Sequence, residues 1–160
     1  MRKTNPYLKQ SRLAEVIAAI TALANYRYYK LTFKAAAEKI ANRPEHAEKW
    51  KAIFHEHPEF FRISQDKVSL VWRRQHPKRY NTKTSKEIPR DEFDLLVEHG
   101  SDTSRISRRP LRPEETTALI DIAVRLHERA IEDKRISYWW IPVLSAGLAF
   151  GGAVLGGLMT

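Results

Sequence analysis

The sequence contains no cysteine, and this absence excludes a disulfide framework and any thiolate metal site. Only six glycines occur, and five of them fall within the last 24 of the 160 residues. That same stretch, 137–160, has no charged residue, although charged residues make up 29% of the chain. The first ten residues lack the apolar run of a signal peptide, so we expect none there. The sequence therefore divides into a polar part of about one-domain size and an uncharged, glycine-rich end.

The formal charge of +9 is unevenly distributed along the chain. Counted as Lys and Arg minus Asp and Glu, residues 1–30 carry +5 and residues 65–90 carry +6. Such basic blocks attract phosphates, whether those of a nucleic acid or of anionic lipid headgroups.

Residues 1–73 show three helical patterns followed by a change of period. Apolar residues at helical spacing predict a helix over 11–26 with Ser11 as its N-cap, a short helix capped by Thr32, and a third helix from 44 or 45 to 56. Apolar residues then alternate in 61–63 and 68–72 around a predicted turn at 65–66, which indicates a β-hairpin. The predicted fold class is therefore mainly α, with a winged-helix-like cytosolic head of three helices plus a hairpin in residues 1–73.

The remainder reads as a connector, a helix and an uncharged tail. Residues 74–112 are rich in Pro, Ser, Thr and Arg and predict a basic connector with one short helix near 93–97. Residues 113–136 predict a long amphipathic helix, since Pro113, Glu114 and Glu115 suit a helix N-terminus. We expect this helix to continue into a single transmembrane helix within residues 137–160.

The tail has the length and composition of a membrane span. Residues 141–159 are uncharged and, as a helix, would extend about 28 Å, close to the thickness of a hydrocarbon core. The predicted interface residues are Tyr138, Trp139, Trp140, Lys134 and Arg135. The lipid bilayer is thus an expected partner, and the basic side predicts a bacterial inner-membrane location with the head cytoplasmic and the C-terminus outside. The alternative is a buried hydrophobic helix.

The tail glycines recur at a spacing typical of packed membrane helices. The residues predicted to pack helices together are Gly147, Gly151, Gly152 and Gly156. Because these rows cover more than one face of the helix, they favour a homo-oligomer with two neighbours for each subunit. The alternative is that glycine is simply common in membrane helices.

A second candidate site lies in the basic block after the predicted hairpin. Arg73, Arg74, Lys78 and Arg79 are predicted to bind an anionic partner, which leaves RNA, DNA, a nucleotide, a lipid surface or a protein open. The predicted third helix, by contrast, carries more Glu than Lys, which suits phosphates poorly. The alternative is a solvated connector.

No catalytic or metal-binding pattern stands out, so we expect neither enzyme activity nor a cofactor. His55 and His57 lie two residues apart at the end of the predicted third helix, a spacing that does not share a helical face, which disfavours a metal site.

Residues 71–80, 104–115, 126–130 and 138–144 resemble a group of small bacterial proteins with a soluble head and a C-terminal glycine-rich membrane helix. Some members are labelled N-carbamoyl-L-amino acid hydrolases, but this chain lacks the clustered His, Asp and Glu ligands that such a metallohydrolase needs. The predicted function is a membrane-anchored, self-associating binding or scaffold protein. The alternatives are a membrane-permeabilising effector of antiviral defence and a membrane-tethered nucleic-acid-binding regulator.

Overall fold

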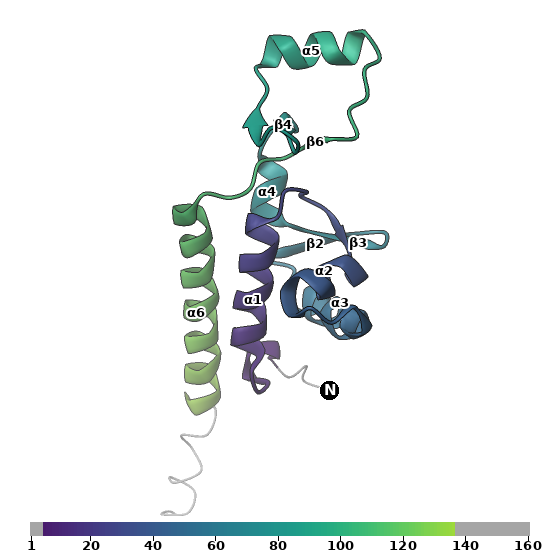
Figure 1. Ribbon diagram of the computed structural model, residues 1–160. Coiled ribbons are helices and arrows are strands. Elements are labelled where there is room, and N and C mark those ends of the chain that lie inside the picture. The colour runs from purple at the N-terminus through teal and green to yellow at the C-terminus, as the bar shows by residue number, and fades with distance from the viewer. Residues whose placement is uncertain (1–4, 137–160) are drawn as a thin grey trace, which may run out of the picture.

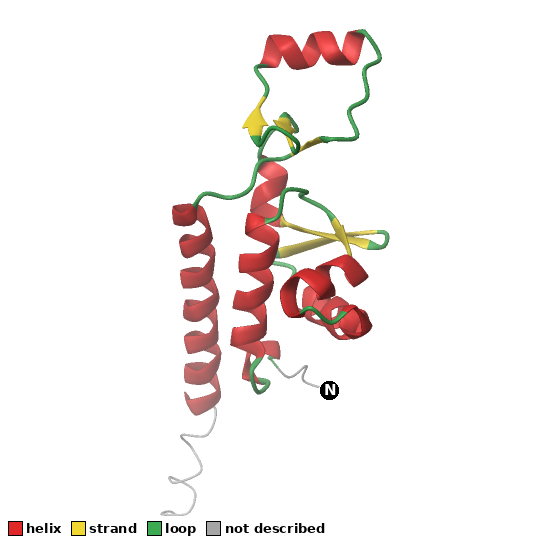
Figure 2. Cartoon of the chain, viewed as in Figure 1, coloured by secondary structure: helices red, strands yellow, loops and turns green. Residues whose placement is uncertain are grey.

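The computed structural model describes residues 5–136 and shows a mainly helical protein with small antiparallel sheets (Figures 1 and 2). Along the chain, the elements are η1 (Pro6–Leu8), α1 (Arg12–Asn25), β1 (Leu31–Thr32), α2 (Phe33–Ala41), η2 (Pro44–His46), α3 (Ala47–Glu56), β2 (Phe61–Ser64), β3 (Lys67–Leu70), α4 (Val71–Gln75), β4 (Tyr80–Asn81), β5 (Lys86–Glu87), α5 (Arg90–Glu98), β6 (Ile106–Ser107) and α6 (Pro113–Ile136). The three helices predicted in residues 11–56 and the hairpin with its turn at 65–66 are confirmed as elements.

The first sheet has the strand order β1-β3-β2, and β2 pairs with β3 so that Phe61 faces Leu70. The hydroxyl of Thr32 caps α2 by accepting from the N–H of Ala35 at 3.2 Å, as its position before the helix predicts. Ser11 occupies the N-cap position of α1, as predicted, but its φ is 61° and its side chain makes no capping hydrogen bond. The strand prediction was too long, because the chain turns at Leu70 into α4 and carries Trp72 into that helix.

One hydrophobic core joins the helices to the first sheet. Aromatic rings of α3 and β2 meet there, with Phe54 and Phe61 centred 5.0 Å apart. Val16 and Ile20 of α1 are fully buried in the same core. Burial of these side chains is the main favourable contribution to the fold.

Helix α6 runs antiparallel to α1 and lies beside it (Figure 1). Leu119, Ala123 and Ala130 are its buried residues, and they lie at helical spacing on one face, as the predicted amphipathic helix requires. At its N-terminus, Glu115 accepts from the N–H of Arg112 at 2.7 Å, so one free backbone donor is satisfied.

The segment predicted to be a connector is more ordered than expected. It contains the predicted short helix, seen as α5, but also α4 and a second sheet with the strand order β5-β4-β6. Helix α5 stands at the far end of the molecule, beyond this sheet (Figure 1), and has no buried residue. The strands were missed because each spans two residues, too few to show a period.

The membrane predictions require correction. Within residues 5–136, no helix is both long enough and apolar enough to cross a bilayer. This finding contradicts the prediction of a single-pass transmembrane protein and of an inner-membrane location with the C-terminus outside. Residues 137–160, where the span and its glycine rows were predicted, lie outside the described residues.

Candidate functional site

Arg73 is the largest fully buried side chain of the described residues, and its guanidinium donates to five backbone carbonyls. Nη1 donates to Leu23, Tyr26 and Tyr28 at 2.8, 2.6 and 3.3 Å. Nε and Nη2 donate to Arg109 and Arg108, at 3.0 and 2.7 Å. Burial lowers the pKa of this guanidinium to about 10, so it stays charged at neutral pH.

The position of Arg73 contradicts its predicted role at an anion-binding surface, because the guanidinium is enclosed by protein. Its role is to organise the fold. The carbonyl of Leu23 belongs to the last turn of α1, where carbonyls lack helical partners. Arg73 also binds carbonyls of the segments 26–28 and 108–109. It therefore holds α4 against the end of α1 with its following loop and against the segment before α6.

Side chains gathered by this arrangement form a surface that we call the basic–aromatic face. Its residues are Arg27, Tyr28, Tyr29, Lys30, Lys78 and Arg108. The guanidinium carbon of Arg108 lies 5.1 Å from the centre of the Tyr29 ring. Arg27 and Lys30 lie over Tyr28 and Tyr29, each at 5.5 Å. Cations from two segments distant in the sequence therefore lie over two adjacent tyrosines.

A pocket of about 270 Å³ opens on this face. It is lined by Tyr28, Tyr29, Lys30, Lys78, Thr103, Ser104, Ile106 and Ser107. None of these described residues is acidic. The combination of two ammonium groups with hydroxyls supplies hydrogen-bond donors and positive charge, which are the groups that bind phosphate.

The hydroxyl of Ser107 is fixed within this pocket. Ser107 is only 2% exposed, and its Oγ accepts from the N–H of Tyr29 at 3.0 Å. Because the oxygen serves as acceptor, the hydroxyl proton remains available to donate to a ligand.

Tyr29 lies in a positive environment. Burial by itself raises the pKa of its hydroxyl, but Arg108 and Lys30 outweigh this effect, and the pKa is lowered overall. Arg108 is itself held in place, because its Nη1 donates to the carbonyls of Arg74, at 2.6 Å, and His76. The field that stabilises a phenolate also attracts an external anion.

Asp102 is the acidic residue nearest in sequence to the pocket lining. Its Oδ1 accepts from the N–H of Ser104 at 2.8 Å and its Oδ2 from the Ser104 hydroxyl at 2.9 Å. These two hydrogen bonds lower the pKa of the carboxyl, so it is ionised at neutral pH. It shapes the loop while placing one negative charge beside the site.

The other predicted anion-binding residues are spread over different surfaces. Lys78 lines the pocket on the basic–aromatic face. Arg74 instead lines a separate pocket of about 400 Å³ with Arg62, and Arg79 follows Lys78 into the second sheet.

Among the predicted membrane-interface residues, Lys134 and Arg135 are exposed at the end of α6. The predicted interface aromatics Tyr138, Trp139 and Trp140 and the four predicted packing glycines, Gly147, Gly151, Gly152 and Gly156, lie outside the described residues.

The charges of α3 are largely engaged within the protein. Lys49 Nζ lies 2.7 Å from a carboxylate oxygen of Glu15 on α1. Glu56 pairs with Lys9 and, at 3.2 Å, with Arg12. Because these charges of α3 are paired with α1 and the N-terminal segment, α3 is poorly suited to contact phosphates.

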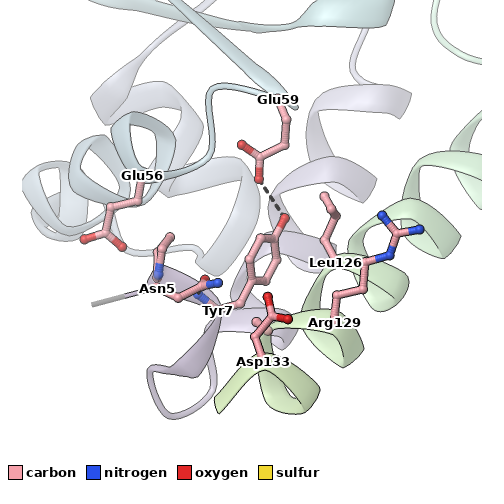
Figure 3. A pocket seen from close by; sticks show the side chains of 9 residues that line it. Asn5, Tyr7, Glu56, Glu59, Leu126, Arg129 and Asp133 are labelled. Carbon is pink, nitrogen blue, oxygen red and sulfur yellow. Dashed lines mark hydrogen bonds between the residues drawn. The ribbon is translucent and has the colours of Figure 1, made fainter. Parts of the chain in front are cut away.

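A larger pocket of about 680 Å³ lies where the N-terminus, the end of α3 and the last turns of α6 meet (Figure 3). Tyr7 points across it, and its hydroxyl donates to Glu59 at 2.7 Å. The same carboxylate oxygen of Glu59 lies 3.1 Å from Nδ1 of the buried His57. Arg129 and Asp133 approach from α6 on the other side.

The chemistry of this larger pocket is that of a structural hydrogen-bond network. Burial, reinforced by Glu59, raises the pKa of the Tyr7 hydroxyl well above its usual range, so it donates a proton but does not lose one. Burial raises the pKa of Glu59, yet hydrogen bonds from His57 and Tyr7 lower it overall. His127 binds the carbonyl of Tyr7 at 3.0 Å, so this network joins the N-terminal segment to α6.

Among residues 5–136, no group of three or more His, Asp or Glu side chains is placed to hold a metal ion. The chain matches no protein-family model, and searches of curated proteins and of solved structures find no significant match. The resemblance noted from the sequence stays an expectation.

Sequence reasoning missed most of the basic–aromatic face. Tyr28, Lys30, Ser107 and Arg108 were not among the predicted site residues. One signal was present, since tyrosines and basic residues alternate within 26–30, a composition typical of nucleic-acid-binding surfaces. The contributions of Ser107 and Arg108 required the tertiary structure, because they lie about 80 residues further along the chain.

Proposed function

We propose that this protein is a winged-helix-like binding module that engages nucleic acid through the basic–aromatic face. The order helix, strand, helix, helix, strand, strand over residues 12–70 supports the winged-helix-like part of the proposal. The observation that carries the function is the pocket, where Lys30 and Lys78 meet two tyrosines and the buried hydroxyl of Ser107. None of its described lining residues is acidic. Phosphate contacts and aromatic rings together are typical of nucleic-acid-binding surfaces.

The proposal moves the interface away from α3. A winged helix commonly reads DNA with its third helix, yet here Lys49 and Glu56 of α3 are paired with residues of α1. The basic–aromatic face has the opposite character, with positive charge in excess and engaged mainly with aromatic rings. The overall charge of +9 also favours association with a polyanion. Self-association through the glycines of 147–156 remains a prediction about residues outside those described.

Fluorescence anisotropy of the full chain with labelled DNA and RNA oligonucleotides at low salt tests this function. We expect Lys30→Glu and Lys78→Glu each to weaken binding about five-fold or more, because each reverses one charge at the phosphate site. Lys34→Glu is the matched control, since Lys34 is an exposed lysine of α2 that does not line the pocket. Absence of wild-type binding to any oligonucleotide, or equal loss in the Lys34 control, contradicts the proposal.

A further inference from the structure

We infer that the basic–aromatic face binds single-stranded nucleic acid in preference to a duplex, with one nucleotide seated in its pocket. This inference rests on the nucleic-acid function proposed above and specifies its ligand. Three features of the face carry it: the elements that build it, the shape and donors of its pocket, and the position of Tyr28.

The face is built mainly from loops and offers nothing that fits a duplex groove. Its residues and those that line its pocket come from 27–30 between α1 and β1, from Lys78 between α4 and β4, and from 103–108 around the two-residue strand β6. Sequence readout of a duplex requires a helix or a two-stranded ribbon to enter the major groove. Helix α5, which precedes residue 103 and has no buried residue, carries three acidic residues, Asp91, Glu92 and Asp94. Phosphates would repel this helix.

The pocket has the size and donors for one phosphate with part of its sugar. A volume of about 270 Å³ is below that of typical drug-sized sites and is open to solvent on one side. Within it, the Ser107 hydroxyl is buried and free to donate, and Thr103 adds a second hydroxyl. The ammonium groups of Lys30 and Lys78 supply charge-assisted hydrogen bonds. A flexible single strand can turn one phosphate into such a hollow, whereas paired and stacked nucleotides cannot leave the duplex without cost.

Tyr28 is placed to stack on the base of that nucleotide. Its ring lines the pocket and is half-buried, so one side is supported by the protein. The guanidinium carbon of Arg27 lies 5.5 Å from the centre of the Tyr28 ring. Because Arg27 is exposed, its side chain can leave the ring and bind a phosphate instead. Base–aromatic stacking is independent of sequence and requires an unpaired base.

The test compares equal-length single-stranded and double-stranded oligonucleotides of one sequence, bound to the full chain in the same salt. We expect the single strand to bind at least ten-fold more tightly. Tyr28→Ala should weaken single-strand binding about ten-fold, in line with measured losses of stacking. Tyr28→Phe, which keeps the ring, should bind like the wild type. Both variants retain the Tyr28 carbonyl that accepts from Arg73, so the loop keeps its anchor.

Asp102→Asn provides an independent check of where the phosphate lies. Removing this negative charge beside Ser104 should strengthen binding several-fold if a phosphate occupies the pocket. Equal affinity for duplex and single strand, together with no effect of Tyr28→Ala, overturns the single-strand inference. The nucleic-acid function still stands in that case if Lys30→Glu weakens binding. Absence of binding to either form overturns both.

Discussion

At the scale of single residues, Arg73 has the widest structural influence. A guanidinium usually lies at the surface, but here it is fully buried and bound to five carbonyls. Hydrogen bonds from a charged group are worth more than neutral ones, and a buried carbonyl without a partner is costly. The residue that the sequence predicted at a surface is therefore buried, and it anchors the segments 26–28 and 108–109.

Arg73→Met should lower the free energy of unfolding by about 3 kcal/mol or more, because it leaves several carbonyls without donors. Urea denaturation followed by tryptophan fluorescence measures the change. Arg74→Met is the control: Arg74 is exposed one position further along, and its replacement should change stability by no more than about 0.5 kcal/mol. Equal losses in the two variants would show that the buried contacts contribute little.

Glu115 predicts a dependence of stability on acid pH. Arg109 donates to both of its carboxylate oxygens at 2.7 Å and, with other contacts, lowers the pKa of Glu115 from 4.5 to about 2. A pKa that is lower in the folded state stabilises the fold above pH 4.5, and this contribution is lost as the pH falls from 4.5 toward 2. Glu115→Gln should therefore destabilise the protein at pH 6 but much less at pH 3.

Urea denaturation of both proteins between about pH 3 and pH 6 measures this difference. Glu114→Gln is the matched control, because Glu114 is an exposed neighbour on the same helical turn. A difference between Glu115→Gln and the wild type that stays constant across this range would contradict the assigned ion pair.

At the scale of elements, the position of α1 between α6 and the first sheet limits the size of its side chains. Ala19 is fully buried, whereas the adjacent Ala18 is exposed. Ala19→Leu should lower the free energy of unfolding by about 1–3 kcal/mol, because the added methylenes overpack a close interface. Ala18→Leu should have little effect, and thermal unfolding of the two variants compares them directly. Similar behaviour of both would contradict the packing described for α1.

Helix α5 makes the opposite prediction. Leu95 and Val97 are each 54% exposed and no residue of α5 is buried. Leu95→Ala should therefore change the free energy of unfolding by no more than about 0.5 kcal/mol. Leu119→Ala, at a leucine of α6 that is 2% exposed, should cost about 2–5 kcal/mol. Chemical denaturation measures both, and a large loss at Leu95 would mean that α5 packs against other parts of the chain.

Most helices could be predicted from the sequence because each shows its own period. Residues 12–25 and 113–136 carry apolar stripes long enough to be recognised, and Thr32 marks the start of α2 by its capping hydroxyl. The second sheet could not be predicted, since strands of two residues form only through partners elsewhere, such as Tyr80 paired with Glu87 and Ser107. Helix α4 lies where a strand end was expected, and from this helix Arg73 extends inward to the carbonyl of Leu23.

At the scale of the whole molecule, the charge of +9 predicts that binding to nucleic acid weakens steeply with salt. The slope of log affinity against log salt reports the number of phosphates neutralised. Neutralising one contact, as in Lys30→Gln, should reduce that slope by about 1, while Lys34→Gln should leave it unchanged. Anisotropy titrations over a salt series give the slopes. An unchanged slope for Lys30→Gln would place the phosphates away from the basic–aromatic face.

By itself, the sequence determined the helical character of the protein, the hairpin, the excess of positive charge and its two blocks. These properties depend on local period and composition, which a single chain segment carries within itself. Only the tertiary structure decided where the charges act. It buried Arg73 against the carbonyls of α1 and two loops, and it brought Tyr28, Lys78 and Ser107 to one pocket. Contacts between residues 50 to 80 positions apart leave no periodic signal, because they arise when the folded backbone brings them together.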